Sequence, residues 1–215
     1  MSLSSFLSKI REELLKKDEV RQETQNLARR TTRISKQVIF SVHRDMIAEA
    51  ENLLREAEAN INELVELSKS YPEICIGLID TPLQEYAEAK IFLELIRSGN
   101  FMGPREVGVP GDSYVLGLAD VVGELRRRAL DLIRRDDIRG AEECLNLMET
   151  IYSELIGCDE LQALIPGLRR KCDIARRIVE ATRGDVTIEG RRTILNNAIK
   201  DLQRTLKSIT SDVEK

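Results

Sequence analysis

The chain contains 215 residues, which is enough for one large domain or two small ones with a real hydrophobic core. Aromatic residues make up only 4% and Trp is absent, which disfavours β-sandwiches and barrels, whereas 33% charged and 42% hydrophobic residues are typical of helical proteins. The net charge of −4 does not indicate a nucleic-acid-binding protein by itself, and a single histidine, His43, excludes His-rich metal sites.

Apolar residues recur at helical spacing through the first 70 residues, which contain no Gly and no Pro. This pattern predicts one very long helix, or a short helix and a long one with a break near Lys16–Asp18. We expect Pro72 to end it. Part of so long a first helix would overhang a compact bundle, and such an overhang favours oligomerisation.

A second helix is expected from about Leu83 to Arg97, with Thr81 as its N-cap and Gly99 after its end. Residues 99–112 are rich in Gly and Pro and are predicted to form the main loop. Further helices are expected at about 114–135, 137–156, 160–182 and 187–211, with Gly184-Asp185 separating the last two. The fold class is therefore all-α, a single domain over 1–215 built as a bundle of six or seven helices.

Charge is distributed unevenly along the chain. Residues 1–48 carry a net charge of +4, and residues 49–100 carry −7. This contrast fits a cationic groove beside an anionic site, and it also fits ordinary solvated helix faces.

The cysteines and the apolar segments indicate the cellular compartment. The four cysteines form no C-x-x-C pair, so we expect them to be reduced and mostly buried, as in an intracellular protein. The sequence has no apolar run of about 18 residues and no signal-peptide pattern at its start, which predicts a cytoplasmic protein that does not enter membranes.

Two carboxylates occupy unusual positions on the helix expected at 83–97. At 100° per residue, Lys90, Glu94 and Arg97 define a polar face, whereas Glu85 and Glu88 point to the apolar side. Carboxylates one turn apart on a buried face repel each other and resist desolvation. They must be protonated, paired with a basic residue, or bound to a cation.

The next helix offers a second acidic pair, Asp120 and Glu124, spaced i,i+4. A plain solvated face is enough to explain this pair, because it shares a polar stripe with Arg127, Asp131 and Arg134. If the two consecutive helices pack antiparallel, however, the two acidic pairs would converge.

Four carboxylates without a histidine form a hard-oxygen site, which prefers Mg²⁺ or Mn²⁺. Such a site suits phosphoryl chemistry, in which the metal activates water and a carboxylate accepts its proton. This spacing fits a metal-dependent nuclease. It also fits the all-α nucleotide pyrophosphohydrolases, which use Glu-x-x-Glu followed by a second acidic pair.

Several segments resemble the translin-associated factor X family. Residues 30–44, RTTRISKQVIFSVHR, are similar to the first-helix motif of that family, and QEYAEA at 84–89 is similar to its Gln-Glu-Tyr-x-Glu-Ala motif. DSYVLGLADVVGEL at 112–125 resembles its second acidic motif, and LRRKCD at 168–173 and TRG at 182–184 resemble segments of its late helices. The region 99–112 is much shorter than the corresponding insertion in the animal protein.

The resemblance implies a seven-helix bundle that assembles into a hollow octamer and cleaves single-stranded RNA with Mg²⁺. It assigns metal-binding and catalytic roles to Glu85, Glu88, Asp120 and Glu124. Translin itself, the non-catalytic branch, keeps only the equivalent of Glu124, so this chain looks like the catalytic branch. Its compact form resembles archaeal members that assemble from a single chain type, although a translin-like partner chain is also compatible with the sequence.

An RNA substrate needs cations near the carboxylates. The first helix carries a stripe of basic residues that predicts a phosphate-binding track or a normal solvated face, and His43 could donate to a phosphate or be a structural residue. The candidate nucleic-acid-binding residues are Arg33, Lys36, His43 and Arg44. Because aromatic residues are scarce, we expect little base stacking and weak sequence specificity. A non-catalytic RNA-binding scaffold like translin is the third hypothesis, and cleavage of single-stranded DNA stays open.

Overall fold

The computed structural model describes the backbone of residues 3–213 and the side chains of residues 3–206, and this part of the chain contains helices but no strands. The prediction of an all-α bundle is therefore confirmed. Six helices are long and three are short. In chain order they are α1 Leu3–His43, α2 Ile47–Ser70, α3 Pro72–Cys75, α4 Asp80–Ser98, α5 Pro104–Val107, α6 Gly111–Arg134, α7 Ile138–Ile156, α8 Asp159–Leu164 and α9 Leu168–Val213.

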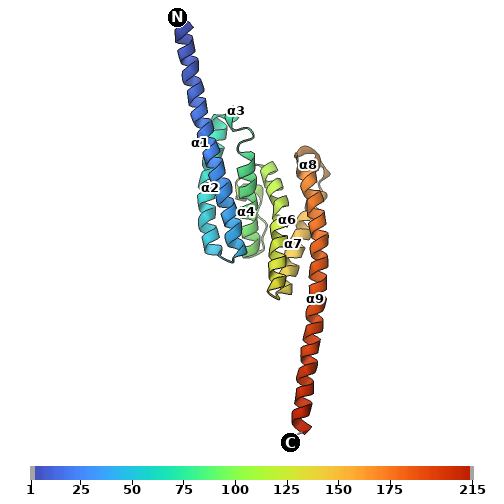
Figure 1. Cartoon of the computed structure of the whole chain (residues 1–215). Coiled ribbons are helices and arrows are strands. Elements are labelled where there is room, and N and C mark those ends of the chain that lie inside the picture. The colour runs from blue at the N-terminus through green and yellow to red at the C-terminus, as the bar shows by residue number, and fades with distance from the viewer. Residues whose placement is uncertain (1–2, 214–215) are drawn as a thin grey trace.

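The long helices form two groups of three. In one group α1, α2 and α4 contact one another, and in the other α6 contacts α7 and α9, which also contact each other. The two groups meet where α4 packs against α6 (Figure 1). A connected core of buried aliphatic side chains, with Tyr86 and Phe92, runs through both groups.

The first long helical region is interrupted at a place that the sequence did not indicate. The helix α1 continues through Lys16–Asp18, so the break predicted there is wrong. The chain turns instead at residues 44–46, where Asp45 adopts a left-handed φ of 60°. Asp45 accepts hydrogen bonds from Arg128 at 2.5 Å and Arg135 at 2.8 Å, which fix the turn against the end of α6. The end of α2 two residues before Pro72 agrees with the prediction.

The helix α4 begins earlier than expected and buries part of its polar face. Thr81 lies inside the first turn rather than at the N-cap, whereas the left-handed Gly99 ends the helix as predicted. The side chain of Lys90 is only 11% exposed, because its ammonium donates to Glu58 at 2.8 Å and to the Tyr86 hydroxyl at 3.1 Å. The face predicted to meet solvent therefore meets α2.

The C-terminal helices also differ from the prediction. Residues 159–164 form the short α8, and α9 then runs unbroken from Leu168 to Val213. Gly184-Asp185 does not interrupt α9. A single glycine costs a helix about 1 kcal/mol, which is too little to end it when the helix packs against α6 and α7.

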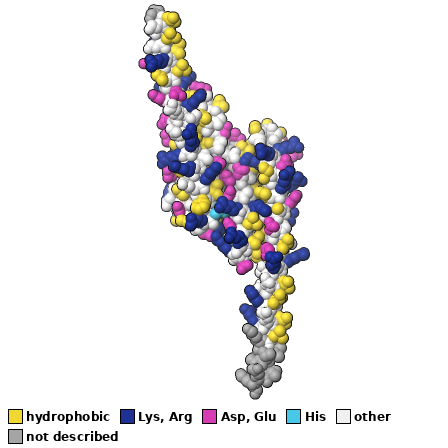
Figure 2. Space-filling model, in the orientation of Figure 1, with side chains coloured by type: hydrophobic (Ala, Val, Ile, Leu, Met, Phe, Trp, Pro, Cys, Tyr) yellow, Lys and Arg dark blue, Asp and Glu magenta, His cyan; other side chains and the backbone are white. Residues whose placement is uncertain are grey.

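Both long terminal helices extend beyond the bundle, in opposite directions (Figure 1). Each extension carries apolar side chains on its surface, visible as yellow stripes in Figure 2. These exposed residues are Leu3, Phe6, Leu7, Ile10, Leu14 and Leu15 on α1, and Ile188, Ile194, Leu195, Ile199, Leu202 and Leu206 on α9. In the described residues, no helix is long and apolar enough to cross a bilayer.

The cysteines agree with expectation. All four are free, and Cys75, Cys144 and Cys172 are buried, whereas Cys158 is exposed. Burial raises the pKa of the Cys144 thiol to about 11, which keeps it protonated and unreactive.

Candidate active site

The antiparallel packing of α4 and α6 brings the two acidic pairs together. Gln84 contacts Asp120, and Glu88 lies beside Gly117. The residue numbers therefore rise along α4 as they fall along α6, which means that the two helices run antiparallel. A Cβ atom at Gly117 would lie 2.8 Å from the Gln84 carbonyl oxygen and 2.9 Å from the Glu88 nitrogen. Glycine at this position therefore allows the two backbones to approach closely where the carboxylates converge.

Glu88 is the central member of this group. Burial, followed by the negative charges of Asp120, Glu124 and Glu85, raises the pKa of its carboxyl group to about 8. The Lys171 ammonium opposes this rise without cancelling it. The other three predicted carboxylates are thus close enough to Glu88 to influence it electrostatically.

Asp120 connects three helices. One carboxylate oxygen accepts a hydrogen bond from the Gln84 amide of α4 at 2.6 Å, and the other contacts the Lys171 ammonium of α9 at 2.5 Å. The side chains of Asp120 and Lys171 are only 27% and 24% exposed, so this ion pair is shielded more than a surface pair.

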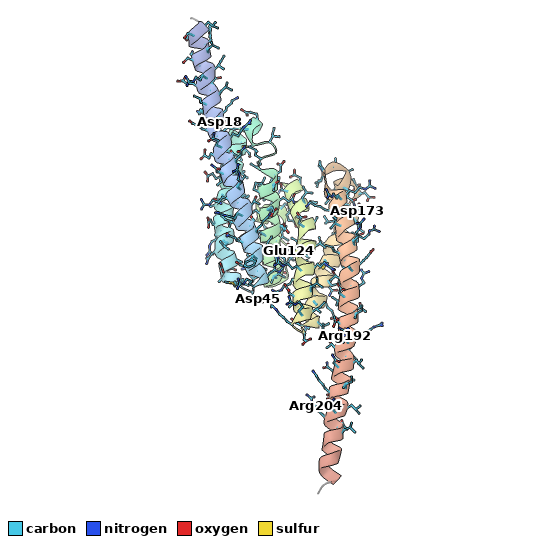
Figure 3. All side chains as sticks on the ribbon, in the orientation of Figure 1. Asp18, Asp45, Glu124, Asp173, Arg192 and Arg204 are labelled. Carbon is cyan, nitrogen blue, oxygen red and sulfur yellow. The ribbon has the colours of Figure 1, made fainter. Side chains whose placement is uncertain are left out.

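Glu124 lies at the centre of the molecule and is bound to the first helix (Figure 3). Its Oε2 atom lies 2.5 Å from Nε2 of His43, whose side chain is 3% exposed and packs against the Phe92 ring at 5.0 Å. Arg127, one turn along α6, lies 4.0 Å from the same carboxylate.

Glu85 is the more peripheral of the two predicted site carboxylates on α4. Its side chain is 20% exposed, and Lys36 of α1 lies 3.5 Å away. This pair shows that the basic stripe of α1 reaches the acidic cluster through Lys36.

The four carboxylates match Mg²⁺ in donor type and in their mutual proximity. As they are placed, however, no three Asp, Glu, His or Cys side chains in the described part of the chain are arranged to hold a metal ion. Asp120, Glu124 and Glu85 each face a basic partner, namely Lys171, His43 and Lys36. A metal ion would therefore replace some of these contacts. Among the described residues, no hydrogen bond or ion pair holds the fourth carboxylate, Glu88.

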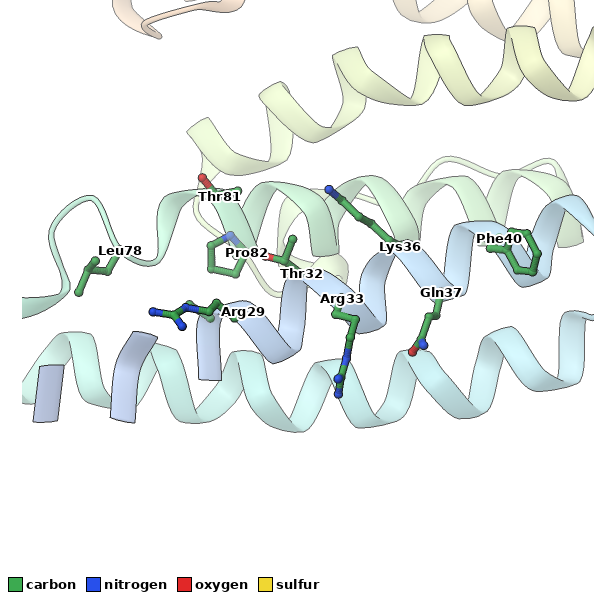
Figure 4. Close-up of a pocket in the computed structure, with 10 residues that line it drawn as sticks. Arg29, Thr32, Arg33, Lys36, Gln37, Phe40, Leu78, Thr81 and Pro82 are labelled. Carbon is green, nitrogen blue, oxygen red and sulfur yellow. The ribbon is translucent and has the colours of Figure 1, made fainter. Parts of the chain in front are cut away.

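A groove of about 640 Å³ lies beside α1 next to this cluster (Figure 4). It is lined by Arg29, Arg33, Lys36 and Phe40 of α1 and by Thr81 and Pro82 of α4, among others. Lys36 points toward α4, whereas Arg33 points the opposite way (Figure 4). Of the predicted basic residues Arg33, Lys36 and Arg44, all within the described part of the chain, only Lys36 forms an ion pair with a predicted site carboxylate.

Of the other predicted nucleic-acid contacts, Arg44 is exposed, with its guanidinium 5.3 Å from the centre of the Phe40 ring. His43 is buried and bonds to Glu124, so it has no surface to offer to a phosphate and belongs to the carboxylate cluster instead.

Sequence reasoning missed two residues that contact the cluster directly, Gln84 and Lys171. Both lie in segments that resemble family motifs, but a single sequence does not show which side chain of a motif points inward. Only the packing of α9 against α6 places Lys171 beside Asp120.

The chain is similar to known proteins over most of its length. The model of the "Translin family" matches residues 19–182. An uncharacterized protein of Methanocaldococcus jannaschii is 35% identical over 193 residues, which cover 88% of this chain and 85% of the relative.

Solved structures show the same fold. The crystal structure of AfC3PO is 32% identical with a TM-score of 0.79, covering 87% of this chain and 98% of that one, and a complex of AfC3PO with duplex RNA superposes equally well. The crystal structure of apo-NeC3PO is 25% identical with a TM-score of 0.79, covering 85% and 96% of the two chains. With the family model covering most of its length, the chain belongs to the translin family.

Proposed function

We propose that the protein is a metal-dependent endoribonuclease, acting on single-stranded RNA in the cytoplasm. The observation that carries the proposal is the convergence of Glu85, Glu88, Asp120 and Glu124 at the contact between α4 and α6, with the pKa of Glu88 raised to about 8 by burial and by the other three. A strongly perturbed carboxylate with other carboxylates converging on it is characteristic of functional sites.

The four carboxylates would together hold the metal ion, with Mg²⁺ the first choice and Mn²⁺ an alternative. When bound, this ion would polarise the phosphodiester and lower the pKa of an attacking water. Among the residues of the chain itself, Glu88 would accept the proton of that water, and Lys36 at the edge of the cluster would neutralise a neighbouring phosphate.

The family membership supports a nucleic-acid substrate, because one similar structure is a complex of AfC3PO with duplex RNA. The groove lined by Arg29, Arg33 and Lys36 offers this chain cations for phosphate contacts. Phe40 is the only aromatic residue in its lining, so binding would depend little on base identity.

The decisive experiment uses end-labelled RNA, single-stranded and duplex, with Mg²⁺ or with EDTA. We expect cleavage of the single strand with Mg²⁺ and none with EDTA, and we expect Glu88→Gln and Asp120→Asn to abolish cleavage while preserving the native assembly. Cleavage by either variant at the wild-type rate would refute the assignment of the site. Single-stranded DNA of the same sequence tests the range of substrates.

An oligomeric shell, with the octamer as its expected form, is part of the proposal. The apolar stripes on the extensions of α1 and α9 support self-association, because exposed apolar surface of this kind usually marks an interface. Native mass spectrometry of the purified chain measures the number of subunits and shows whether one chain type is sufficient.

A non-catalytic RNA-binding protein is the second candidate, favoured by the basic partners that already occupy Asp120, Glu124 and Glu85. This candidate predicts RNA binding that EDTA leaves unchanged and no cleavage products. Nucleotide pyrophosphohydrolysis predicts release of pyrophosphate or monophosphate from free nucleotides, and no observation here favours it.

A further inference from the structure

Lys171 places its ammonium against Asp120, one of the four carboxylates of the proposed metal site. Its Nζ atom is 2.5 Å from Oδ1 of Asp120, and the Gln84 amide donates to the other oxygen of the same carboxylate. The two partners together use both oxygens of Asp120. A metal ion that binds an oxygen of Asp120 would therefore lie close to one of these two partners.

Of the two partners, the ammonium is the one that a metal ion would expel. An ammonium and a divalent cation on one carboxylate repel each other, whereas the neutral Gln84 amide carries no net charge and can keep its hydrogen bond. Lys171 also has a flexible four-carbon stem, so its charge can move without any change in the backbone.

The structure offers the displaced side chain a place to go. A cleft of about 360 Å³ lies between α6 and α9, lined by Asp120, Gly123, Gly167, Arg170 and Lys171 among others. A Cβ atom at Gly123 or Gly167 would meet no atom within 4 Å, so this part of the cleft is open beside the ion pair. An ammonium that moved into it would lie on the side of Arg170.

We propose that Lys171 is an internal competitor of the divalent metal for Asp120, and that metal binding transfers its ammonium into the cleft between α6 and α9. The inference rests on the proposed metal site. In the absence of metal, Lys171 offsets part of the negative charge of the four carboxylates. With metal bound, its charge becomes available to a phosphate group of the RNA beside Arg170. Lys171 is thus a positioning residue, which acts through Asp120.

The test measures Mn²⁺ binding to the full-length protein without RNA, from the electron paramagnetic resonance signal of free Mn²⁺. The variants are Lys171→Met, which removes the competing charge, and Lys171→Arg, which keeps a cation. The matched control is Arg170→Met, which removes a cation from the same cleft but not from Asp120. The Asp120→Asn variant is measured alone and combined with Lys171→Met.

We expect Lys171→Met to bind Mn²⁺ roughly three- to tenfold more tightly than the wild type, the range set by the strength of a partly exposed ion pair. Lys171→Arg and Arg170→Met should stay within about twofold of the wild type. In the Asp120→Asn background, Lys171→Met should give no gain, because the site of competition is gone. A role of Lys171 in folding alone would weaken binding, so tighter binding separates competition from structural damage.

Equal or weaker binding by Lys171→Met, with a wild type that binds Mn²⁺, overturns this inference and leaves the proposed nuclease site intact. An equal gain in Arg170→Met also overturns it, since general charge removal would then explain the effect. Absence of Mn²⁺ binding in the wild type and in every variant overturns both this inference and the metal-dependent function.

Discussion

Nε2 of His43 lies 2.5 Å from Oε2 of Glu124, and this contact joins the last residue of α1 to the middle of α6. The imidazole is buried against Phe92, so its position is fixed by packing. The orientation of a site carboxylate is therefore determined by a helix that ends 81 residues earlier in the chain.

Replacement of His43 by Ala should test this dependence. The variant loses a buried hydrogen bond and leaves a cavity beside Phe92, so we expect the free energy of unfolding to fall by roughly 2–3 kcal/mol. Affinity for Mn²⁺ should fall about tenfold or more, as is typical when the partner that orients a metal ligand is removed. Urea denaturation and Mn²⁺ titration measure the two effects, and unchanged Mn²⁺ affinity would show that Glu124 does not need its partner.

Gly117→Ala should disturb the site through the backbone. The new methyl group would lie less than 3 Å from the backbone of α4, which forces the two helices apart and should cost about 1–3 kcal/mol in stability. The matched control is Gly123→Ala on the same helix, where the methyl group meets nothing and should stabilise the helix by up to about 1 kcal/mol. Thermal unfolding compares the two, and equal behaviour would contradict the close approach at Gly117.

The raised pKa of Glu88 should appear in the pH dependence of stability without metal. Its folded-state pKa of about 8 lies above the ordinary value of 4.5, so the folded protein holds a proton that the unfolded chain loses between these pH values. Stability should therefore decrease from about pH 4.5 to about pH 8, by an amount on the order of 2–4 kcal/mol.

Glu88→Gln removes this titration, so the variant should be more stable than the wild type at pH 9 in EDTA and should lack the decrease. Urea denaturation at several pH values measures the difference. If the free energy of unfolding depended on pH in the same way in the wild type and the variant, the carboxyl group of Glu88 would not be perturbed.

Mg²⁺ should stabilise the folded protein, because a ligand that binds only the folded state raises the unfolding temperature. We expect an increase of several degrees in the wild type at saturating Mg²⁺ and little or none in Asp120→Asn. The effect should weaken as the pH falls below about 8, where Glu88 takes up its proton and competes with the metal. An equal increase in the variant would place the binding elsewhere.

The extension of α9 should take part in assembly. Leu195, Ile199 and Leu202 are spaced at intervals of four and three residues, which aligns them on one exposed stripe of the helix. We expect the double variant Leu195→Lys/Leu202→Lys to lower the native mass while the helical content is kept. Lysine at the exposed Asn197 and Arg204, on the opposite face of the helix, is the control.

Much of the carboxylate cluster could be predicted because its four members lie in two short segments of the sequence. The spacing of Glu85 and Glu88 against the apolar positions of α4 indicated a carboxylate that desolvation would perturb, and the pKa of Glu88 agrees. The same helical projection misplaced Lys90, which is more buried than Glu85. Periodicity does not reveal that α2 covers the polar face with partners such as Glu58.

The turn after α1 shows a second limit of sequence reasoning. It contains neither Gly nor Pro, and a left-handed Asp45 is stabilised there by Arg128 and Arg135, which are distant in the sequence. Conversely, Gly184 resembles a helix end but lies inside α9. In both cases tertiary contacts outweigh the local conformational preference of the residue. Lys171 also depends on a tertiary contact, because its partner Asp120 lies on another helix.

The extensions of α1 and α9 leave the bundle at opposite ends, so one subunit presents its exposed apolar stripes at two separate points. A unit with two such points can meet two neighbours at once. If the first extension binds the last extension of the next subunit, the angle between them decides whether the series closes into a ring or continues as a fibre. If each extension pairs with its own kind, two-fold axes alternate along the assembly. In either case the geometry of the two terminal helices would govern the size of any space that the assembly encloses.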